Sequence, residues 1–268
     1  MNKYDFVMVI KAENCNPNGD PLSEGRPRTN IGGYGEISAE CVKRKLRNRL
    51  QDAGNDIFVQ SDDRCEDGFK CLHERATSVG ELEKALKNNE KEQVVDIACS
   101  RWIDVRLFGQ LFAFSGGTSV GIRGAVSVCH SKSVAPVSVK DIQITKSTNS
   151  EPAKKGKGKS SDTMGCKYII EDACYIVKGS VNPFMSEKNG VTEEDVNALK
   201  YAMTTLFEND ESSARPSGSM DVLQVYWFSQ DGKNYLPSAK IHNLVHVAED
   251  GTAVVDNVPS GVKMELLV

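Results

Sequence analysis

The stretch from Asn16 to Leu50 constrains this chain most, because a loop rich in glycine and proline runs directly into a strongly basic segment. The three prolines of the loop fix φ, and its five glycines permit conformations that other residues avoid, so the backbone has a defined shape. Arg26 and Arg28 flank Pro27, and such a braced pair of guanidinium groups suits phosphate oxygens. The stretch indicates a polyanion site, with an ordinary surface loop as the alternative.

The basic segment is predicted to be a helix. Ser38 is placed to cap its N-terminus, and an apolar stripe recurs at helical spacing at Ala39, Val42, Leu46 and Leu50. At about 100° per residue, the outward positions are Arg44, Arg47 and Asn48, with Lys43 and Lys45 on the flanks. This pattern is typical either of a polyanion-binding face or of a solvated helix surface.

Composition indicates a globular protein of 268 residues, built as one elaborated domain or two small ones. Hydrophobic residues make up 39% and charged residues 26% of the chain. No apolar run approaches the roughly 18 residues of a membrane span, and the N-terminus carries no cleavable signal pattern. We therefore expect a cytoplasmic protein without membrane contact, and eight irregularly spaced cysteines favour reduced thiols.

Charge is segregated along the chain. The net charge of −4 argues against a nucleic-acid binder when taken alone. Residues 24–50, however, hold seven basic and three acidic residues, as do residues 140–168, whereas residues 187–221 hold three basic and eight acidic ones. A chain with separate basic and acidic surfaces can bind a polyanion on one and pack head-to-tail on a copy of itself with the other.

Periodicity gives a coarse order of elements. A core strand is predicted at 3–12 and a short one at 56–60. Residues 61–120 form a predicted insertion, with a helix at 78–89 and an apolar segment at 93–114 that is long enough for a buried helix. Thr192 and Asp195 open a second clear helix as a capping pair. Further strands are predicted at 125–128, 134–146, 166–183, 221–229, 239–250, 251–258 and 262–268.

Two other segments suggest contact with an anion. Arg123 lies between Gly121 and Gly124, where a backbone or a phosphate could approach closely. Residues 146–165 are polar and lysine-rich, which predicts a flexible basic loop that becomes ordered on nucleic acid. Residues 153–160 match a relaxed P-loop pattern, but turn chemistry follows where a P-loop needs a helix, so low complexity explains the match.

Catalytic and metal-binding patterns are weak. His242 and His246 lie in a predicted strand without a third ligand, and Cys65, Cys71 and His73 lack the spacing of a zinc knuckle. Cys129 and His130 are adjacent in a predicted strand and so point to opposite faces. Asp20 is the one acid placed where a phosphodiester could lie, although stabilisation of the turn at Pro21 also explains it. We therefore expect no catalytic residue, cofactor or metal.

The order of elements fits an α+β fold with a ferredoxin-like, RNA-recognition-motif-like core that carries insertions. Seven long motifs then give a specific resemblance: NPNGDP at 16–21, RPRTN at 26–30, CVKRKLRNRLQ at 41–51, DVRLFGQLFAF at 104–114, GIRGAVSV at 121–128, TMGCK at 163–167 and ARPSGSMDV at 214–222. Over nearly its whole length the chain resembles the backbone subunit of the type I-C Cascade CRISPR effector complex, in the CRISPR-associated protein seven family.

The resemblance implies a non-catalytic subunit that oligomerises head-to-tail along guide RNA and presents its bases for pairing with invading DNA, together with other Cascade subunits. It also implies a palm core at 1–60 and 121–268, an inserted finger region at 61–120, and a flexible, thumb-like loop at 147–165. Because any spacer must be accepted, contacts should be made to sugar and phosphate. The residues implied to face nucleic acid are Asn18, Arg26, Arg28, Thr29, Lys43, Arg44, Arg47, Arg123, Met164 and Arg215.

Stacking of bases on aromatic side chains is not expected to be the main mode of binding, because few aromatic residues apart from Tyr34 lie near the basic loops.

Two alternative functions remain. The first is a CRISPR-type endoribonuclease that cuts target RNA with the loop aspartate Asp20, although Asn30 stands where an acid is usual after RPRT. The second is a metabolic α/β enzyme that uses the P-loop-like run.

Overall fold

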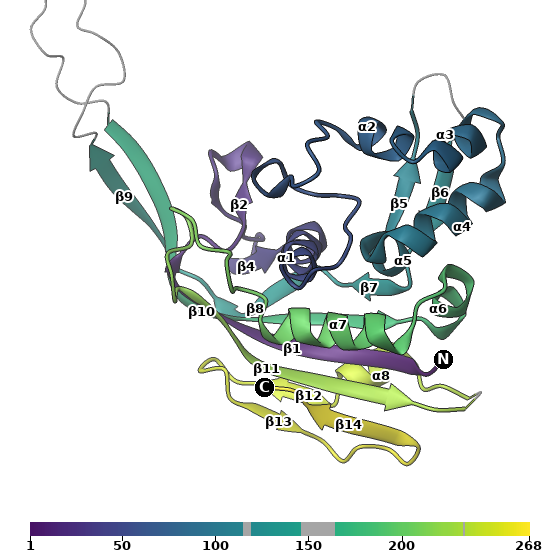
Figure 1. The fold of residues 1–268 in the computed structure, drawn as a ribbon. Coiled ribbons are helices and arrows are strands. Elements are labelled where there is room, and N and C mark those ends of the chain that lie inside the picture. The colour runs from purple at the N-terminus through teal and green to yellow at the C-terminus, as the bar shows by residue number, and fades with distance from the viewer. Residues whose placement is uncertain (115–118, 146–163, 233) are drawn as a thin grey trace, which may run out of the picture.

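A large antiparallel sheet forms the body of the protein, whose computed structural model describes residues 1–114, 119–145, 164–232 and 234–268 (Figure 1). Within these residues the eight-stranded sheet has the order β14-β11-β1-β10-β8-β4, and β7 and β9 also pair with β10. Its strands are β1 (Lys3–Cys15), β4 (Tyr34–Ile37), β7 (Val126–Val128), β8 (Ser131–Pro136), β9 (Val139–Thr145), β10 (Met164–Val181), β11 (Met220–Gln230) and β14 (Val262–Leu266). The predicted α+β class is confirmed as a mixed α/β fold with a large antiparallel sheet.

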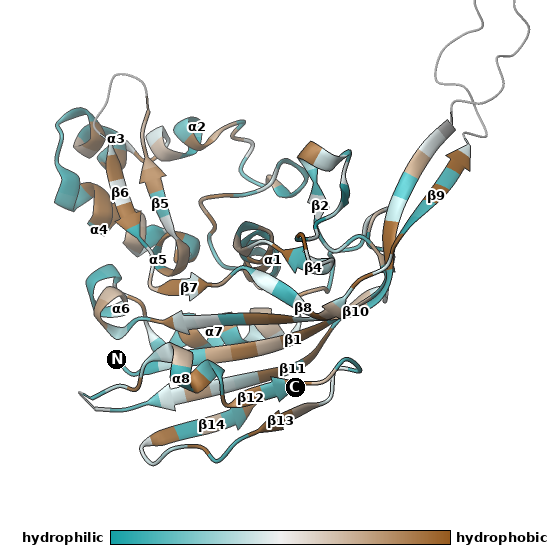
Figure 2. Ribbon diagram, turned by 180° about the vertical axis from the view of Figure 1, so that it is seen from behind, coloured by the Kyte–Doolittle hydropathy of each residue, from teal (hydrophilic) through white to brown (hydrophobic). Residues whose placement is uncertain are grey.

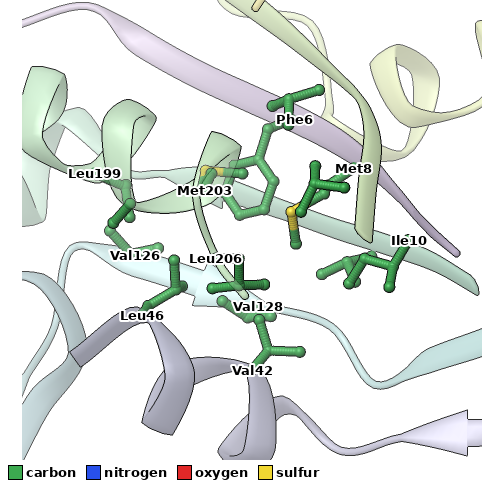
Figure 3. Packing of buried hydrophobic residues seen from close by; sticks show 14 of the residues in the cluster. Phe6, Met8, Ile10, Val42, Leu46, Val126, Val128, Leu199, Met203 and Leu206 are labelled. Carbon is green, nitrogen blue, oxygen red and sulfur yellow. The ribbon is translucent and has the colours of Figure 1, made fainter. Parts of the chain in front are cut away.

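Strand β1 is central because both of its faces are apolar. Phe6, Met8 and Ile10 point to one face and pack against helices α1 (Ala39–Asp52) and α7 (Glu193–Thr204) (Figure 3). Val7 points to the other face, because neighbouring side chains of a strand alternate. The sheet is therefore covered by helices on one side and by the C-terminal elements on the other.

The two helix starts that the sequence predicts are confirmed. The Ser38 hydroxyl accepts a hydrogen bond from Cys41 N at 3.2 Å, and α1 begins there. Thr192 and Asp195 form a reciprocal capping box at the start of α7. Short helix α6 (Pro183–Asn189) precedes α7, with Asn182 as its cap.

The opposite face of the sheet is covered by helix α8 (Ser238–His242) and the hairpin of β12 (Val245–Val247) and β13 (Ala253–Val255) (Figure 2). The predicted strand at 239–250 is wrong in its first half. Pro237 supplies a fixed φ at the start of α8, and the buried Ile241 anchors that helix to Tyr226 and Phe228 of the sheet. No helix in the described ranges is both long and apolar enough to cross a membrane.

Residues 58–122 build a second apolar cluster around Phe58, Trp102 and Phe112, apart from the cluster beside the sheet. Its elements are α2 (Leu72–Thr77), α3 (Gly80–Lys87), α4 (Lys91–Arg101), α5 (Ile103–Phe108), β5 (Gly109–Phe112) and β6 (Val120–Arg123). The predicted helix at 78–89 is confirmed as α3. The apolar segment at 93–114, which is long enough for a buried helix, is divided into α4, α5 and β5, because Trp102 is extended between α4 and α5 and Gly109 has φ +77°.

Two predicted strands also differ from the structure. Residues 56–60 form no strand, and the backbone N–H groups of Phe58 and Val59 donate to the Asp104 carboxylate at 2.7 and 3.1 Å. The predicted strand at 134–146 is two strands, β8 and β9, because Pro136 ends β8 and has no N–H to continue the ladder.

The glycine-rich loop after β1 contains short regular segments of its own. It contains the two-residue strands β2 (Gly19–Asp20) and β3 (Arg26–Pro27), joined by the 3-10 turn η1 (Pro21–Ser23). Beside it, β9 and the first half of β10 leave the body as a two-stranded arm (Figure 1). Of the predicted loop at 147–165, only Met164 and Gly165 lie within the described residues, as the start of β10.

Candidate nucleic-acid interface

Helix α1 carries the basic run, and its cations fall into two groups. Lys45 and Arg49 are buried, with side chains only 5% and 8% exposed, and they pair with Asp210 and Glu208 of the segment after α7. The prediction that Lys45 lies on an exposed flank is therefore wrong. The physical reason is that α7 packs beside α1 and brings acidic residues against it from far along the chain.

The Arg47 side chain also points into the protein interior. Its Nε donates to Asp104 Oδ2 at 3.0 Å, and its guanidinium lies 5.0 Å from the centre of the Phe108 ring. Its side chain is 13% exposed, so the prediction that Arg47 points outward is wrong. Asp104 is fully buried, and its charge requires a cation at this position of α1.

Lys43 and Arg44 form the other group, since neither makes an ion pair with any residue that the structure describes. Arg44 is half-buried and donates to Asn48 Oδ1 at 3.2 Å. Burial lowers the pKa of the Arg44 guanidinium, and the neighbouring charge of Arg47 lowers it further. Arg44 is thus a partly desolvated cation without an ion-pair partner among the described residues, although the more distant carboxylates of Asp104 and Asp63 act against the shift, and this position favours the approach of an anion.

A cavity of about 250 Å³ lies between α1 and the loop at 209–215. Its lining includes the cations Arg44, Lys45, Arg64 and Arg215 and the acids Asp63, Asp210 and Glu211. The Arg215 Nε donates to Asp210 Oδ2 at 3.1 Å, so one carboxylate serves both Arg215 and Lys45. Burial lowers the pKa of Lys45, and the Asp210 carboxylate acts against that shift.

The loop also brings Arg28 to this end of α1. Burial raises the pKa of the Cys41 thiol, while the nearby charges of Lys45, Arg215 and Arg28 oppose that shift. Arg28 lies 3.6 Å from Asp20 Oδ1, and its buried Nε has no hydrogen-bond partner in the described part of the chain. The structure therefore gathers Arg28, Arg44 and Arg215 around the N-terminal half of α1.

Asn18 and Thr29 shape the loop. Asn18 Oδ1 accepts from Ser38 N at 2.9 Å, and the Asn18 carbonyl accepts from Arg28 N at 2.9 Å. Thr29 forms a β-bridge with Gly35. Asn18 thus joins the loop to the first turn of α1 and fixes where Arg28 stands.

Asp20 stabilises the turn. Its carboxylate accepts hydrogen bonds from Leu22 N at 3.2 Å and from Ser23 Oγ at 2.9 Å. The Ser23 hydrogen bond and then the Leu22 hydrogen bond hold the pKa of Asp20 below its usual range. These hydrogen bonds agree with the interpretation that Asp20 stabilises the turn at Pro21.

Arg26 contacts the arm. Its Nη2 lies 2.5 Å from Asp141 Oδ2 of β9, and its guanidinium stacks 4.3 Å from the centre of the Tyr168 ring of β10. The Tyr168 hydroxyl lies 3.2 Å from Glu24 Oε2. Sequence reasoning missed Asp141 and Tyr168, since both are more than 100 residues from Arg26 and no local pattern marks them.

Two predicted residues lie elsewhere. Arg123 is exposed at the end of β6, opposite Gly109, and its carbonyl accepts from Asn189 Nδ2 at 2.8 Å. A Cβ at Gly124 would lie 2.3 Å from the carbonyl carbon of Phe108, so the close approach expected here is made by backbone. Met164 opens β10 opposite Thr145, at the far end of the arm.

The ring face of Tyr34, the aromatic residue near the basic loops, is covered by a lysine of the same chain. The Lys132 ammonium lies 3.6 Å from the centre of the Tyr34 ring, and Tyr34 belongs to β4 while Lys132 belongs to β8. The second aromatic of this region is Tyr168, which the sequence did not indicate.

The histidines and cysteines considered as ligands are dispersed. His242 lies in α8, buried against the Gly179 carbonyl, whereas His246 lies in β12 and pairs with Asp256. Cys71 caps α2 through its sulfur, and the His73 ring contacts Phe114 edge-on at 5.0 Å. In the described ranges, no group of three or more His, Cys, Asp or Glu side chains is arranged to hold a metal ion.

Comparison with known proteins adds a family and a fold. The family model described as CRISPR-associated protein Cas7 matches residues 2–262. A CRISPR-associated protein Cas7 from Haloferax volcanii is 32% identical over 116 residues, which cover 42% of this chain and 33% of the relative. The match thus spans about a third of that relative's length.

Two solved structures share the fold. A chain of a structure titled "CRISPR RNA-guided surveillance complex, pre-nicking" aligns with a TM-score of 0.55 at 16% identity, covering 89% of this chain and 81% of that one. A chain of a "CRISPR RNA-guided surveillance complex" aligns with a TM-score of 0.51 at 17% identity, covering 93% and 77%. Because the family model extends over nearly the whole sequence, this chain belongs to the CRISPR-associated protein Cas7 family.

Proposed function

We propose that the protein is the backbone subunit of a type I-C Cascade CRISPR effector complex. In this role, copies oligomerise head-to-tail along guide RNA, grip its sugar-phosphate backbone and present its bases for pairing with invading DNA. The family match over residues 2–262 supports this assignment, as does the fold shared with chains of RNA-guided surveillance complexes. Other Cascade subunits are the further expected partners, in the cytoplasm.

One observation carries the RNA-binding part of the proposal. Arg44 is a half-buried cation without a carboxylate partner in the described residues, and Arg28 and Arg215 lie around the same end of α1. Phosphate would supply the missing counterion at Arg44 without any readout of base sequence. A subunit that accepts every spacer needs this kind of contact.

The palm is proposed to be a ferredoxin-like core. Strands β11, β1, β10 and β7 lie side by side and antiparallel in that order, and α1 and α7 pack on one face. Taken in chain order, they give strand, helix, strand, strand, helix, strand. This is the sequence of elements in the ferredoxin-like motif.

The finger is proposed at 61–120 and the thumb at the end of the β9–β10 arm. The separate apolar cluster built around Phe58, Trp102 and Phe112 supports a finger with its own core. The arm supports the thumb because it carries Met164 and leads into the lysine-rich stretch at 146–163, which lies outside the described residues. Arg123 is proposed to face RNA from the base of the finger.

We propose a binding role without catalysis. The endoribonuclease alternative depends on Asp20, and the carboxylate of Asp20 is engaged by Leu22 N and Ser23 Oγ in the turn. This engagement favours a shaping role over a catalytic one. Incubating the assembled complex with complementary RNA and magnesium tests the alternative, which predicts cleavage that Asp20→Ala abolishes.

A double variant of α1 tests the RNA-binding proposal. Lys43→Glu with Arg44→Gln should weaken guide-RNA binding and flatten its dependence on salt by about 0.7 in log–log slope per lost phosphate contact. Fluorescence anisotropy between low and moderate salt measures both quantities. Arg47 is left intact because it pairs with the buried Asp104.

The matched control is Lys188→Glu with Arg101→Gln, which makes the same change in charge at exposed positions of α6 and α4. The control should bind RNA like the wild type. If the α1 variant is folded and keeps both the affinity and the salt slope of the control, the proposed palm contact is wrong.

A further inference from the structure

Arg26 is a predicted RNA contact that forms an ion pair with the β9–β10 arm. Its guanidinium lies between the Asp141 carboxylate, at 2.5 Å, and the face of the Tyr168 ring, at 4.3 Å. The Asp141 hydrogen bond raises the pKa of Arg26, so the guanidinium is fully charged in this contact. We name the contact of Arg26, Asp141, Tyr168 and Glu24 the arm clamp.

The contacts of the arm clamp are all made on one face of the arm. Asp141 and Tyr168 are directly opposite in the β9–β10 register, so their side chains point to the same face. Ile142 and Lys167 are the next opposed pair and point to the other face. The loop that follows β1 is therefore attached to the arm from one side only.

The clamp matters because the arm is a two-stranded ribbon where it leaves the sheet (Figure 1). An isolated ribbon of two strands is marginally stable in water, and its direction depends on contacts at its base. Arg26 and Glu24 supply such contacts from the loop. The same loop holds Arg28 beside the N-terminal half of α1.

The pairing of Arg26 with Asp141 is readily exchanged. The two side chains are 41% and 54% exposed, and an ion pair in water at this exposure contributes little to stability. A phosphate offers the guanidinium the same bidentate, charge-assisted contact as a carboxylate and can therefore replace it.

We propose that Asp141 holds Arg26 in the RNA-free protein and that a backbone phosphate of the guide RNA takes its place, which releases the arm from the loop. The inference rests on the proposed function, since it assumes that guide RNA passes the loop. Asp141 then sets the RNA affinity of the free protein without touching RNA. The arm changes its attachment when RNA binds.

Thermodynamic linkage makes the inference testable, because whatever frees Arg26 must strengthen RNA binding by the same factor. Asp141→Asn keeps the size of the side chain and removes its charge. In the full chain with guide RNA as the probe, it should raise the affinity about two- to five-fold, the range expected for one exposed ion pair. In an Arg26→Met background the same substitution should have no effect.

Glu171→Gln is the matched control. Lys140 and Glu171 also form an ion pair between β9 and β10, and their side chains are 53% and 47% exposed. The control removes one negative charge from the same arm and leaves Arg26 paired. An equal gain in affinity for Glu171→Gln and Asp141→Asn would overturn the proposal, as would a gain that persists without Arg26.

Hydrogen exchange of the RNA-free protein supplies a second readout. The amides of residues 139–143 and 166–170 should exchange faster in Asp141→Asn than in Glu171→Gln, because the former loses the clamp. Equal exchange in the two variants would show that Arg26 does not hold the arm. If the wild-type protein binds no RNA, the proposed function fails, whereas exchange still reports on the clamp.

Discussion

Asp104 shows how one buried charge joins three parts of the chain. Its carboxylate accepts hydrogen bonds from Phe58 N, Val59 N and Arg47 Nε, and the side chain is fully buried. Phe58 belongs to the second apolar cluster, while Arg47 belongs to α1 beside the sheet. Asp104 therefore links residues 58–59 and α5 to helix α1.

Replacing Asp104 with asparagine should destabilise the protein by about 3–5 kcal/mol. The substitution leaves Arg47 buried beside an uncharged amide, and an uncompensated buried charge is costly. Urea unfolding followed by circular dichroism measures the loss. Asp96→Asn on the exposed side of α4 is the control and should change stability by less than about 0.5 kcal/mol. A similar small change at Asp104 would contradict this account of the junction.

His242 is a buried group whose protonation opposes folding. It is 8% exposed, and its Nε2 lies 2.8 Å from the Gly179 carbonyl. Burial lowers the pKa of His242 below 6.5, while the hydrogen bond to Gly179 and the charge of Asp5 act in the opposite direction. The folded protein therefore holds this ring neutral.

The stability of the protein should fall as the pH drops below about 6.5. Just below that pH the unfolded chain binds a proton at His242 more readily than the folded chain, whereas well above it the ring is neutral in both states. Unfolding free energies at pH 7.5 and 5.5, compared between the wild type and His242→Gln, isolate the contribution. An identical pH dependence in both proteins would remove this role of His242.

Local residue chemistry was predictable where the partner lies within a few positions. Ser38 and Thr192 each accept a hydrogen bond from the backbone N–H three residues further along the chain, and the sequence predicts both caps. Lys45 meets Asp210 across 165 positions and Arg47 meets Asp104 across 57. Periodicity places these two cations on the surface of a helix, and only packing decides what covers that surface.

At the scale of elements, β10 illustrates how closely the strands and helices are packed. A Cβ built on Gly179 would lie 2.2 Å from the Phe6 ring and 2.4 Å from the Ser127 carbonyl oxygen. The strand therefore needs glycine where β1 and β7 flank it. Near the other end of the strand, a Cβ at Gly165 would touch Ile144 at an ordinary 3.4 Å.

Gly179→Ala should destabilise the protein by about 3 kcal/mol or prevent folding, because the backbone carbonyl of Ser127 cannot move aside as a flexible side chain would. Gly165→Ala on the same strand is the control and should be nearly neutral. Thermal unfolding of the two variants makes the comparison. Equal melting temperatures would contradict the packing described at Gly179.

Elements with a strong local pattern were predictable, and those defined by their neighbours were not. The helix at α3 and the capped helix α7 have both periodicity and end signals. Residues 56–60 are apolar enough for a strand, but their amides are used by Asp104. Residues 239–242 alternate like a strand, yet Pro237 and the contact of Ile241 with the sheet make a short helix.

At the scale of the molecule, the basic and acidic segments partly neutralise each other. Asp210 and Glu208, from the acidic segment, pair with Lys45 and Arg49 of the basic helix. The segregation seen in the sequence is therefore only partly a segregation of surfaces. Glu193 and Glu194 are exposed at the start of α7, and the Glu193 carboxylate accepts a hydrogen bond from the Tyr4 hydroxyl at 3.1 Å.

Assembly on RNA tests the head-to-tail proposal directly. With guide RNAs of increasing length, the mass of the complex should rise in steps of one 29.3 kDa chain. Mass photometry or sizing with light scattering resolves such steps. One bound copy at every RNA length would contradict oligomerisation along the guide, while leaving RNA binding itself intact.

The long strand β10 imposes a rule on how chains of this architecture can vary in length. Its 18 residues run without interruption from the arm into the core, so both halves share one alternation of sides. Removing a single residue between Tyr168 and Tyr175 would turn Tyr168 away from Arg26 while the core kept its register. An even number of inserted or deleted residues in that interval keeps Tyr168 on the side of the arm that faces Arg26, whereas an odd number does so only where a bulge absorbs the extra residue.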